Sequence, residues 1–193
     1  MSRVKLNLIA AACENMGIGV NGALPWRLKK EMTYFATMTT KVSDPSKVNA
    51  VIMGRRTWDC IPNQYRPLKN RVNIVLTHHV DSIILLTYFV KTFRVPDGVV
   101  VVPGLDEAVE YIEGREDVES TWVIGGSSIY AAAMSHQNCG KIYLTEIQKS
   151  FDCDTFFPNI DKQQYHLVDE EDIPGEKQLE GDISYYYRVY KKL

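Results

Sequence analysis

The sequence predicts an α/β fold, with a single domain over residues 1–193. Its core should be a mixed, mostly parallel sheet of about eight strands, with helices on both faces and an antiparallel strand at the C-terminus. Short apolar runs alternate with helical patterns for most of the length, which is typical of a parallel sheet. The last two strand-like stretches have no helix between them and should pair antiparallel. A chain of 193 residues with 45% hydrophobic residues suits one domain with a proper core.

The predicted elements follow one another without internal repeats or low-complexity segments. Strands are predicted at 4–12, 50–53, 72–77, 99–102, 122–124, 141–147, 165–168 and 184–190. Helices are predicted at about 28–40, from 56 up to Pro62, from Gly104 through 112, and at 127–134. A glycine loop at 17–24 and a polar linker at 41–47 connect the first of these elements.

One segment, residues 82–90, does not fit this alternation. It reads S-I-I-L-L-T-Y-F-V, an almost unbroken apolar run that is too short to span a bilayer. A buried strand or packed loop is the favoured interpretation, and we expect it to pack on the sheet edge. An exposed version would instead be a patch for self-association.

Composition excludes several classes of function. A net charge of -2 argues against a general nucleic-acid or membrane-surface binder. No run approaches the roughly 18 apolar residues of a membrane span. Lys5 and Asn7 interrupt the apolar N-terminal run, so it indicates a buried strand rather than a signal peptide. The four cysteines lack CxxC or CxH spacing, which predicts free thiols, no metal site and a cytoplasmic protein.

The stretch from Gly17 to Glu31 is the first candidate for function. It holds three glycines within six residues, and its Asn-Gly pair is a strong turn signal. Leu28, Met32 and Phe35 form one apolar helix face, with the Glu31 carboxylate at its edge. This is either an ordinary surface loop and amphipathic helix, or a mobile loop that closes over a buried, functional carboxylate.

Two junctions between a strand and a helix are candidate anion sites. They read G-R-R-T at 54–57 and G-G-S-S at 125–128. Free backbone N–H groups and the helix dipole favour anions at such ends, and glycine permits close backbone approach. A solvated basic surface and a tight turn are the plain alternatives. Neither junction matches G-x-G-x-x-G, so a standard dinucleotide fingerprint is absent.

Taken together, these motifs resemble the dihydrofolate reductase family. The resemblance rests on the N-terminal strand followed in order by M-G-I-G, L-P-W, I-M-G-R-R-T-W, R-P-L-K-N-R, I-G-G-S-S-I-Y and D-T-F-F-P. It covers nearly the whole chain and implies the dihydrofolate-reductase-like fold. Glutamate at Glu31 indicates a eukaryotic-type protein, and the end at Leu193 leaves no room for a fused thymidylate synthase, so a monofunctional enzyme is expected.

The resemblance implies NADPH-dependent reduction of 7,8-dihydrofolate to 5,6,7,8-tetrahydrofolate. Hydride would pass to C6 of the pterin, and N5 would be protonated. This reaction supports one-carbon metabolism and the synthesis of thymidylate and purines. The resemblance also implies inhibition by antifolates such as methotrexate, and we expect a monomer without metal or membrane partners.

The resemblance assigns the substrate side of the site residue by residue. Glu31 matches the family's acidic residue, Thr145 the threonine that supports it, and Trp26 the tryptophan that holds a water near it. Other substrate-binding matches are Ile9, Ala10, Met32, Phe35, Ile61, Pro62, Leu68, Arg71 and Ile124. Phe35 and Ile61 would sandwich the aminobenzoyl ring, and Arg71 would pair with the glutamyl α-carboxylate.

The cofactor side is implied in the same way. The matching residues are Ala11, Ile18, Gly19, Gly22, Leu24, Gly54, Arg55, Arg56, Thr57, Leu76, Thr77, His78, Gly125, Gly126, Ser127, Ser128, Ile129 and Tyr130. Nicotinamide would lie between Ala11, Ile18 and Tyr130, beside a cis peptide joining Gly125 to Gly126.

The phosphates of the cofactor would meet the first junction. Arg55 and Thr77 match contacts to the 2′-phosphate, with His78 nearby, and Arg56 and Thr57 match contacts to the pyrophosphate. These arginines could also be a solvated basic surface, and His78 a plain turn residue.

Three positions depart from the family pattern. Arg27 follows Trp26 without the extra proline of vertebrate enzymes. Pro103 lies where some relatives place a basic residue, so the phosphate clamp should rest more heavily on Arg55. Tyr65 replaces a smaller polar residue near the substrate tail.

Two other functions are compatible with these motifs. One is a pteridine or pyrimidine reductase on the same fold, such as those of riboflavin synthesis. Glu31, Phe35 and Arg71 together favour the folate. The other is a non-catalytic nucleotide- or RNA-binding module, which would not consume NADPH when dihydrofolate is added.

Overall fold

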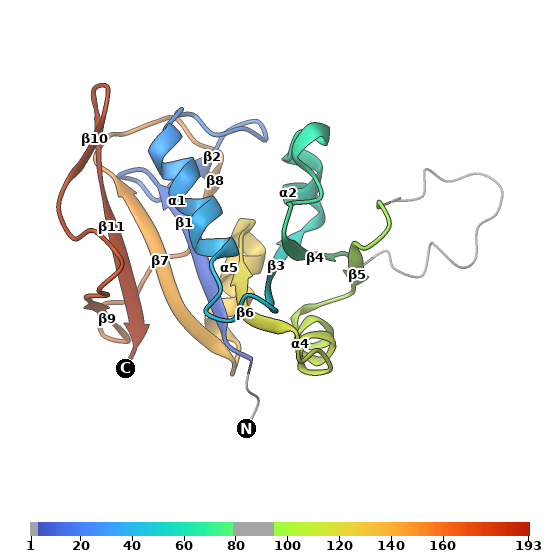
Figure 1. Cartoon of the computed structure of the whole chain (residues 1–193). Helices are drawn as coiled ribbons and strands as arrows, with labels where there is room; N and C mark the ends of the chain where they lie inside the picture. Colours follow the sequence, from blue (N-terminus) through green and yellow to red (C-terminus); the bar gives the residue numbers. More distant parts are fainter. Residues whose placement is uncertain (1–3, 79–94) are drawn as a thin grey trace.

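The computed structural model describes residues 4–78 and 95–193 (Figure 1). In chain order the elements are β1 (Leu6–Ala12), β2 (Gly17–Gly19), α1 (Lys29–Thr40), β3 (Val48–Gly54), α2 (Arg55–Cys60), a 3-10 turn (Asn63–Tyr65), β4 (Arg71–Leu76), β5 (Val100–Val102), α4 (Leu105–Glu113), β6 (Val118–Val123), α5 (Ser127–Ser135), β7 (Cys139–Ile147), β8 (Thr155–Phe156), β9 (Tyr165–Val168), β10 (Gln178–Glu180) and β11 (Ile183–Lys192). The predicted apolar segment 82–90 lies outside the described residues.

A mixed, mostly parallel sheet forms the centre of the molecule, as the sequence predicts, and within the described residues it has nine strands where about eight were expected. Its order is β10-β11-β7-β1-β6-β3-β4-β5. Strand β9 also pairs with β11, at residues 189–192, beyond the part that pairs with β10. Strands β7, β1, β6, β3, β4 and β5 run parallel. Strand β11 pairs antiparallel with β7, and β9 and β10 pair antiparallel with β11. The predicted antiparallel pairing of the two late strands is confirmed in the register Val189↔Val168.

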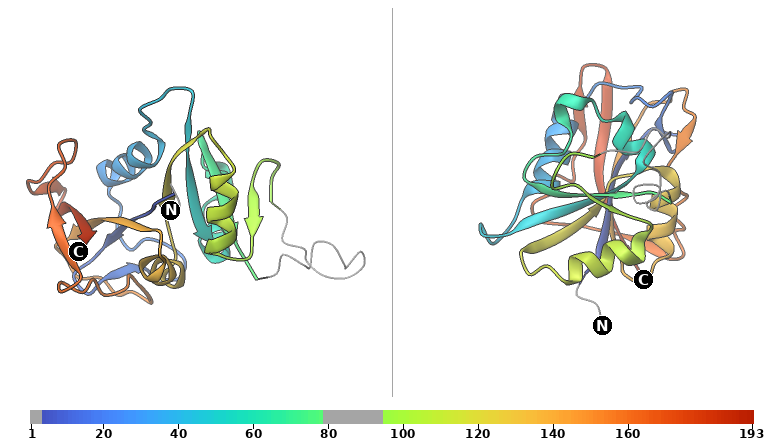
Figure 2. Two further views of the ribbon diagram at one scale, coloured as in Figure 1. Left: turned by 90° about the horizontal axis from the view of Figure 1, so that it is seen from below. Right: turned by 90° about the vertical axis from the view of Figure 1, so that its right-hand side faces the viewer.

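Helices cover both faces of this sheet because its central strands are apolar on both sides. Along β3, Ala50 and Ile52 belong to the core cluster under α4 and α5, whereas Val51 and Met53 belong to the cluster under α1 and α2. This alternation follows from the two-residue repeat of a strand. Figure 2 shows α1 and α5 on opposite sides of the sheet.

Three short strands were not predicted. Strands β2 and β8 form a separate two-stranded sheet, and β10 is a three-residue edge strand. Strand β2 lies inside the glycine loop, where Val20 and Ala23 form a bridge across Asn21 and Gly22. Both turn residues have positive φ, 50° and 75°, as in the hairpin turns that Asn-Gly favours. The loop is therefore a small hairpin rather than irregular chain.

The prediction of one continuous apolar face on α1 was wrong. Leu28 is buried, but it precedes the helix, and Met32 is 49% exposed. The buried residues of α1 are instead the polar Glu31 and Thr39. Such burial of polar side chains requires hydrogen-bond partners, and it marks α1 as more than a structural helix.

The described chain contains no helix long and apolar enough to cross a membrane. All four cysteines are free thiols. Within residues 4–78 and 95–193, no group of three or more His, Cys, Asp or Glu side chains is arranged to hold a metal ion.

Candidate active site

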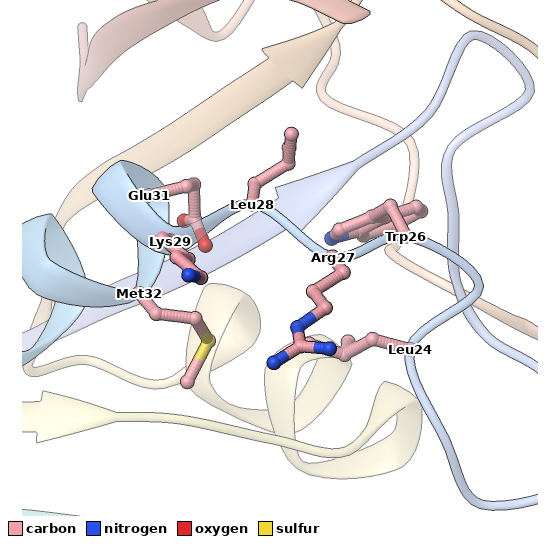
Figure 3. Close-up of a pocket in the computed structure, with 7 residues that line it drawn as sticks. All are labelled: Leu24, Trp26, Arg27, Leu28, Lys29, Glu31 and Met32. Atoms are coloured by element: carbon pink, nitrogen blue, oxygen red, sulfur yellow. The ribbon is translucent and has the colours of Figure 1, made fainter. Parts of the chain in front are cut away.

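A cavity of about 320 Å³ opens between the start of α1 and the segment that precedes it (Figure 3). Its lining residues are Leu24, Trp26, Arg27, Leu28, Lys29, Glu31 and Met32. Leu24, Trp26, Glu31 and Met32 were predicted site residues. Arg27, Leu28 and Lys29 were not, because nothing in their local sequence distinguishes them from surface or core positions.

Glu31 is the buried carboxylate of this cavity. It is 5% exposed, and its Oε1 accepts a hydrogen bond of 3.1 Å from the Thr145 hydroxyl of β7. Burial raises the pKa of Glu31 to about 7, the Thr145 bond acts against this rise, and the negative charge of Glu180 adds to it. Near neutral pH the group therefore exists in both protonation states, as suits a functional carboxyl.

Glu180 is a neighbour that the sequence did not reveal. Its carboxylate accepts hydrogen bonds from the backbone N–H of Lys30, at 3.0 and 3.1 Å. The two residues are 150 positions apart, so no local motif could signal the contact.

Trp26 lines the same cavity as Glu31, is buried, and lies edge-on to Phe151, with ring centroids 5.5 Å apart. The Nε1–H groups of Trp26 and Trp122 are the buried side-chain donors of the described chain without a protein acceptor. Because buried donors usually have partners, the Trp26 Nε1–H suits a water or a ligand atom in the cavity.

Strand β1 supplies the floor between the two halves of the site. The Ile9 carbonyl accepts a 2.8 Å hydrogen bond from the buried Tyr130 hydroxyl of α5. Ala11 pairs with Thr145 in the β1–β7 register. Ala10, which lies between Ile9 and Ala11 in the sequence, is buried in the core cluster under α4 and α5.

Four of the other predicted substrate-side residues pack against one core cluster. Phe35, Ile61, Leu68 and Ile124 are partly buried and pack against the cluster that contains Ile9. Pro62 is exposed at the end of this group. None of the five lines the cavity, which lies closer to Glu31.

Arg71 begins β4 and is held by protein contacts. Its Nη1 donates to the Thr39 hydroxyl at 2.8 Å, and its Nε donates to the Lys69 carbonyl at 2.9 Å. Burial lowers the pKa of Arg71 from its usual value, yet a guanidinium stays charged at neutral pH. Thr39 was not predicted, although it fixes the direction of this cation. Tyr65 lies nearby in sequence and is exposed.

The two strand–helix junctions lie side by side on neighbouring strands β3 and β6. The Gly54 N–H donates to the Gly125 carbonyl at 2.8 Å. The Gly125-Gly126 peptide is cis, as the resemblance implies, and Gly125 has φ of 134°. A Cβ at Gly125 would lie 3.2 Å from the Thr57 hydroxyl, and one at Gly54 would lie 3.1 Å from Ile129. Glycine is therefore required for this close approach.

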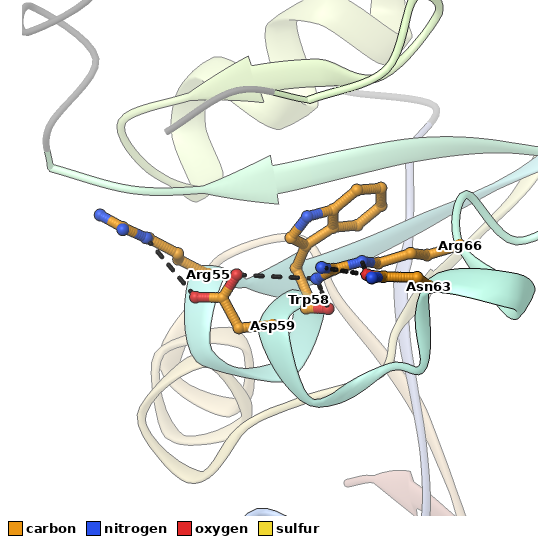
Figure 4. Close-up of polar contacts among 5 residues, drawn as sticks. All are labelled: Arg55, Trp58, Asp59, Asn63 and Arg66. Carbon is orange, nitrogen blue, oxygen red and sulfur yellow. Dashed lines mark hydrogen bonds and ion pairs between the residues drawn. The ribbon is translucent and has the colours of Figure 1, made fainter. Parts of the chain in front are cut away.

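The basic junction carries an ion-pair network (Figure 4). Arg55 Nε lies 3.6 Å from Asp59, whose other oxygen lies 3.6 Å from Arg66. The Arg55 side chain is 41% exposed, and Arg56 is exposed. Asp59 was not predicted as part of this site, although its i, i+4 spacing from Arg55 is a readable signal.

The remaining cofactor-side residues border these junctions. Leu76 and Thr77 are buried at the end of β4, His78 is exposed, and Pro103 is exposed after β5. Ile18 and Ile129 pack against the core cluster under α4 and α5, and Tyr130 is a member of that cluster. The Ser127 hydroxyl donates to the Phe156 carbonyl of β8, so it links α5 to the hairpin sheet. The other predicted cofactor-side residues are Gly19, Gly22 and Ser128, in β2, its turn and α5.

Comparisons with known proteins agree with this geometry. The sequence model of the family described as dihydrofolate reductase matches residues 5–192. The chain is 80% identical to a dihydrofolate reductase of Heliothis virescens over 193 residues, covering 100% of both chains. It is 41% identical to one of Drosophila melanogaster, covering 98% of each.

A solved structure, Schistosoma mansoni dihydrofolate reductase, superposes with a TM-score of 0.80 at 37% identity. The match covers 98% of this chain and 99% of that one. The fold, the matched length and the identity to the insect sequence lead to one conclusion: this chain belongs to the dihydrofolate reductase family of oxidoreductases and is of the eukaryotic type.

Proposed function

We propose that the chain reduces 7,8-dihydrofolate to 5,6,7,8-tetrahydrofolate with NADPH, by hydride transfer to C6 and protonation at N5. Family membership implies a dihydrofolate substrate and a nicotinamide cofactor in general. The observations that carry the finer proposal are the buried Glu31–Thr145 pair at the cavity and the two glycine junctions that adjoin each other on β3 and β6.

Glu31 recognises the pterin ring in this proposal. An ionised carboxylate accepts two hydrogen bonds at once, which matches the adjacent 2-amino and N3 donors of the ring. Thr145 fixes one carboxylate oxygen, so the ring meets a preset direction. Phe35 and Ile61 sandwich the aminobenzoyl group, and Arg71 pairs with the glutamyl α-carboxylate. The apolar packing of the first two and the Thr39-held guanidinium suit these roles.

The cofactor would lie across the two junctions. NADPH, when bound, supplies the hydride that dihydrofolate accepts. The chain provides a backbone without side chains at Gly54, Gly125 and Gly126, where added Cβ atoms would crowd Ile129 or Thr57. The N-terminus of α5 adds N–H groups without a side-chain cap.

Individual contacts follow the same placement. Arg55 and Thr77 bind the 2′-phosphate, and Arg56 and Thr57 bind the pyrophosphate. Ala11, Ile18 and Tyr130 enclose the nicotinamide. The Tyr130–Ile9 bond fixes the position of that tyrosine beside β1.

Proton delivery to N5 needs no contacting side chain in this proposal. Glu31 orients the ring and biases its tautomer, the Trp26 Nε1–H holds a water near the carboxyl, and water carries the proton. The β2 hairpin closes over the nicotinamide and excludes bulk water, so its opening influences turnover.

The wider biology remains part of the proposal. We infer a cytoplasmic, single-domain, monomeric enzyme that serves one-carbon metabolism and the synthesis of thymidylate and purines. Antifolates such as methotrexate should compete at the Glu31 cavity.

The test is to follow NADPH absorbance after adding dihydrofolate to the purified chain. Rapid, methotrexate-sensitive loss of absorbance with dihydrofolate, and little with pyrimidine or other pteridine substrates, is the expected result. Preference for one of the other substrates would replace the folate assignment with a related reductase. Binding of NADPH without any absorbance loss would indicate a non-catalytic module and overturn the proposal.

A further inference from the structure

Helix α1 begins without a cap of its own. The residue before it is Leu28, whose side chain has no hydrogen-bonding atom, and no side-chain cap is present there. The first N–H groups of a helix have no partner within it and need acceptors from elsewhere. The first turn also contains Glu31, so its capping bears directly on the site.

Glu180 supplies the missing acceptor from the opposite end of the chain. Both of its carboxylate oxygens lie within 3.1 Å of the Lys30 nitrogen. Its Oε2 also accepts a 2.8 Å bond from the hydroxyl of Tyr185, a fully buried residue of β11. The carboxylate is thus held between the helix start and the sheet.

The ionisation state of Glu180 agrees with this role. Partial burial acts to raise the pKa of Glu180, but hydrogen bonds from the Lys30 N–H, the Tyr185 hydroxyl and the adjacent N–H groups of α1 lower it overall. The group is therefore ionised at neutral pH, and a negative charge at a helix N-terminus is stabilising.

We propose that Glu180 is a positioning residue of the reaction, which holds the first turn of α1 so that Glu31 stays bonded to Thr145 and faces the cavity. This proposal rests on the substrate-binding role proposed for Glu31. Because Glu31 directly follows Lys30, loss of the cap would loosen the carboxylate that the substrate needs.

The charge of Glu180 has a second effect, since it disfavours ionisation of Glu31. The titratable or charged groups around Glu31 are Tyr34 of its own helix, Tyr130 of α5, Tyr187 of β11 and Glu180, with Arg27 and Lys29 on the cavity wall. Burial raises the pKa of all three tyrosines, so they are neutral at pH 7. Of these groups, Glu180 is the one that is negatively charged at pH 7, and its charge raises the pKa of Glu31.

Two variants separate position from charge. Glu180→Gln keeps an oxygen acceptor and removes the charge that raises the pKa of Glu31, so the Glu31-dependent step in the pH profile of kcat/KM should move to lower pH. Glu180→Ala removes the cap, so KM for dihydrofolate should rise about tenfold, with KM for NADPH unchanged. Glu176→Gln is a matched control, since Glu176 is exposed in the same segment, and it should behave as wild type.

The outcomes distinguish this proposal from the proposed function. Near-normal activity of Glu31→Gln would remove the role of Glu31 itself. A severe defect in Glu31→Gln, combined with an unchanged pH profile and KM in both Glu180 variants, would overturn the role of Glu180 alone. If Glu180→Ala does not fold, Glu180→Asp takes its place, because the shorter side chain keeps the charge but draws the carboxylate away from the Lys30 N–H. An unchanged KM for dihydrofolate in that variant would overturn the positioning role.

A separate observation concerns two thiols. Cys13, directly after β1, and Cys153, two residues before β8, place their Sγ atoms 3.9 Å apart. Both lie against Gly17, where a Cβ would be 2.4 Å from Cys153 Sγ and 3.0 Å from Cys13 Sγ. Gly17 is the first residue of β2, which pairs with β8. The thiols therefore meet at the base of the hairpin, where only glycine leaves room for them.

The geometry points to a reversible disulfide between Cys13 and Cys153, formed by exchange with a small disulfide such as oxidised glutathione. The Cys153 thiolate attacks one glutathione sulfur and expels a glutathione thiolate. The Cys13 thiolate then attacks Cys153 Sγ and expels the second. Two cysteines are oxidised, one glutathione disulfide is reduced to two thiols, and the two cysteine protons pass to those thiols. The link would tie the end of β1 to the segment before β8, across the first residue of β2.

Thiol counting and activity test this second inference. Wild type incubated with oxidised glutathione at alkaline pH, which favours thiolates, should lose two of its four thiols, give a Cys13–Cys153 peptide in mass spectrometry, and lose kcat severalfold until dithiothreitol is added. Cys60→Ser removes an exposed thiol and should behave the same way, whereas Cys153→Ser should keep its activity. Glutathione attached to Cys60 alone, or four unchanged thiols, would overturn the inference.

Discussion

The two sides of the site are built in opposite ways. On the substrate side, one carboxylate is 5% exposed. Thr145, which donates to it, and Glu180, which caps its helix, come from strands distant in sequence. On the phosphate side, Arg55 is 41% exposed and pairs with Asp59 one turn away. The first is fixed by tertiary packing, and the second by its own short helix and by solvent.

This difference predicts how each side responds to substitution. A buried group without water to replace its partner loses its full hydrogen-bond energy, whereas an exposed charge is screened and its loss is softened by solvent. Single changes on the substrate side should therefore be severe and specific, and those on the phosphate side milder.

The largest effect is expected for Glu31→Gln. The amide keeps the size of the side chain but has an NH2 donor in place of one acceptor oxygen, so it cannot pair with two adjacent ring donors, and kcat/KM for dihydrofolate at pH 7 should fall roughly 100-fold or more. KM for NADPH should barely change. Steady-state kinetics measure both quantities, and near-normal kcat/KM would remove the contrast between the two sides.

The same substitution, although it lowers activity, should raise the stability of the fold above neutral pH. The pKa of Glu31 rises from its ordinary 4.5 to about 7 on folding, so the folded chain holds a proton that the unfolded chain releases in this range. Stability from this group is present below pH 4.5 and is lost as pH rises through about 7. Above pH 7, Glu31→Gln should therefore be more stable than wild type by up to about 3 kcal/mol. Urea unfolding at pH 5 and pH 8 checks this, and a variant less stable at pH 8 contradicts it.

Arg71→Leu should have the next largest effect. A partly shielded bidentate pair of guanidinium and carboxylate contributes roughly 1.5–3 kcal/mol, so folate and methotrexate should bind about 10- to 100-fold more weakly. Lipophilic antifolates without a glutamate should be spared. Inhibition constants for both classes give the answer, and equal loss for both would contradict the role of Arg71.

Arg55→Ala should have the smallest effect. The NADPH 2′-phosphate distinguishes it from NADH and carries about -1.5 to -2 charges near neutral pH. One exposed charge-assisted contact suggests that KM for NADPH rises about tenfold and that KM for NADH stays nearly constant. Kinetics with both cofactors provide the measurement.

Arg56→Ala is the matched comparison, because it should weaken both cofactors through the pyrophosphate. An equal penalty on NADH and NADPH in Arg55→Ala would show that the 2′-phosphate is bound elsewhere.

Sequence patterns were most informative where local periodicity decides structure. The parallel strands, the four helices and the antiparallel C-terminal pair follow from such patterns, and each lies within a few residues of its predicted range. Strands β2, β8 and β10 have two or three residues, too few for a pattern, and exist because a partner strand is nearby. The helical pattern already made Glu31 a candidate, whereas Thr145 and Arg71 were identified as site residues by the resemblance alone.

Contacts between distant residues account for what was missed. Glu180 caps a helix 150 positions away, and Thr39 orients Arg71 from 32 positions away. Met32 occupies an apolar position of α1 yet points to the cavity, because Glu31 takes the buried place beside it. These choices depend on the assembled sheet and have no local signature.

The two-stranded β2–β8 sheet determines where the structure should open locally. It is joined to neighbouring chain by few backbone bonds, among them Cys13 N–H to the Gly17 carbonyl and Asp154 N–H to the Gly19 carbonyl. Separating β2 from β8 leaves the nine-stranded sheet paired, so the hairpin is a local unfolding unit whose amides should exchange with solvent long before those of β1. A substitution that weakens the pairing of β8 with β2 should thus make the hairpin open more often while the melting temperature of the protein stays close to that of wild type.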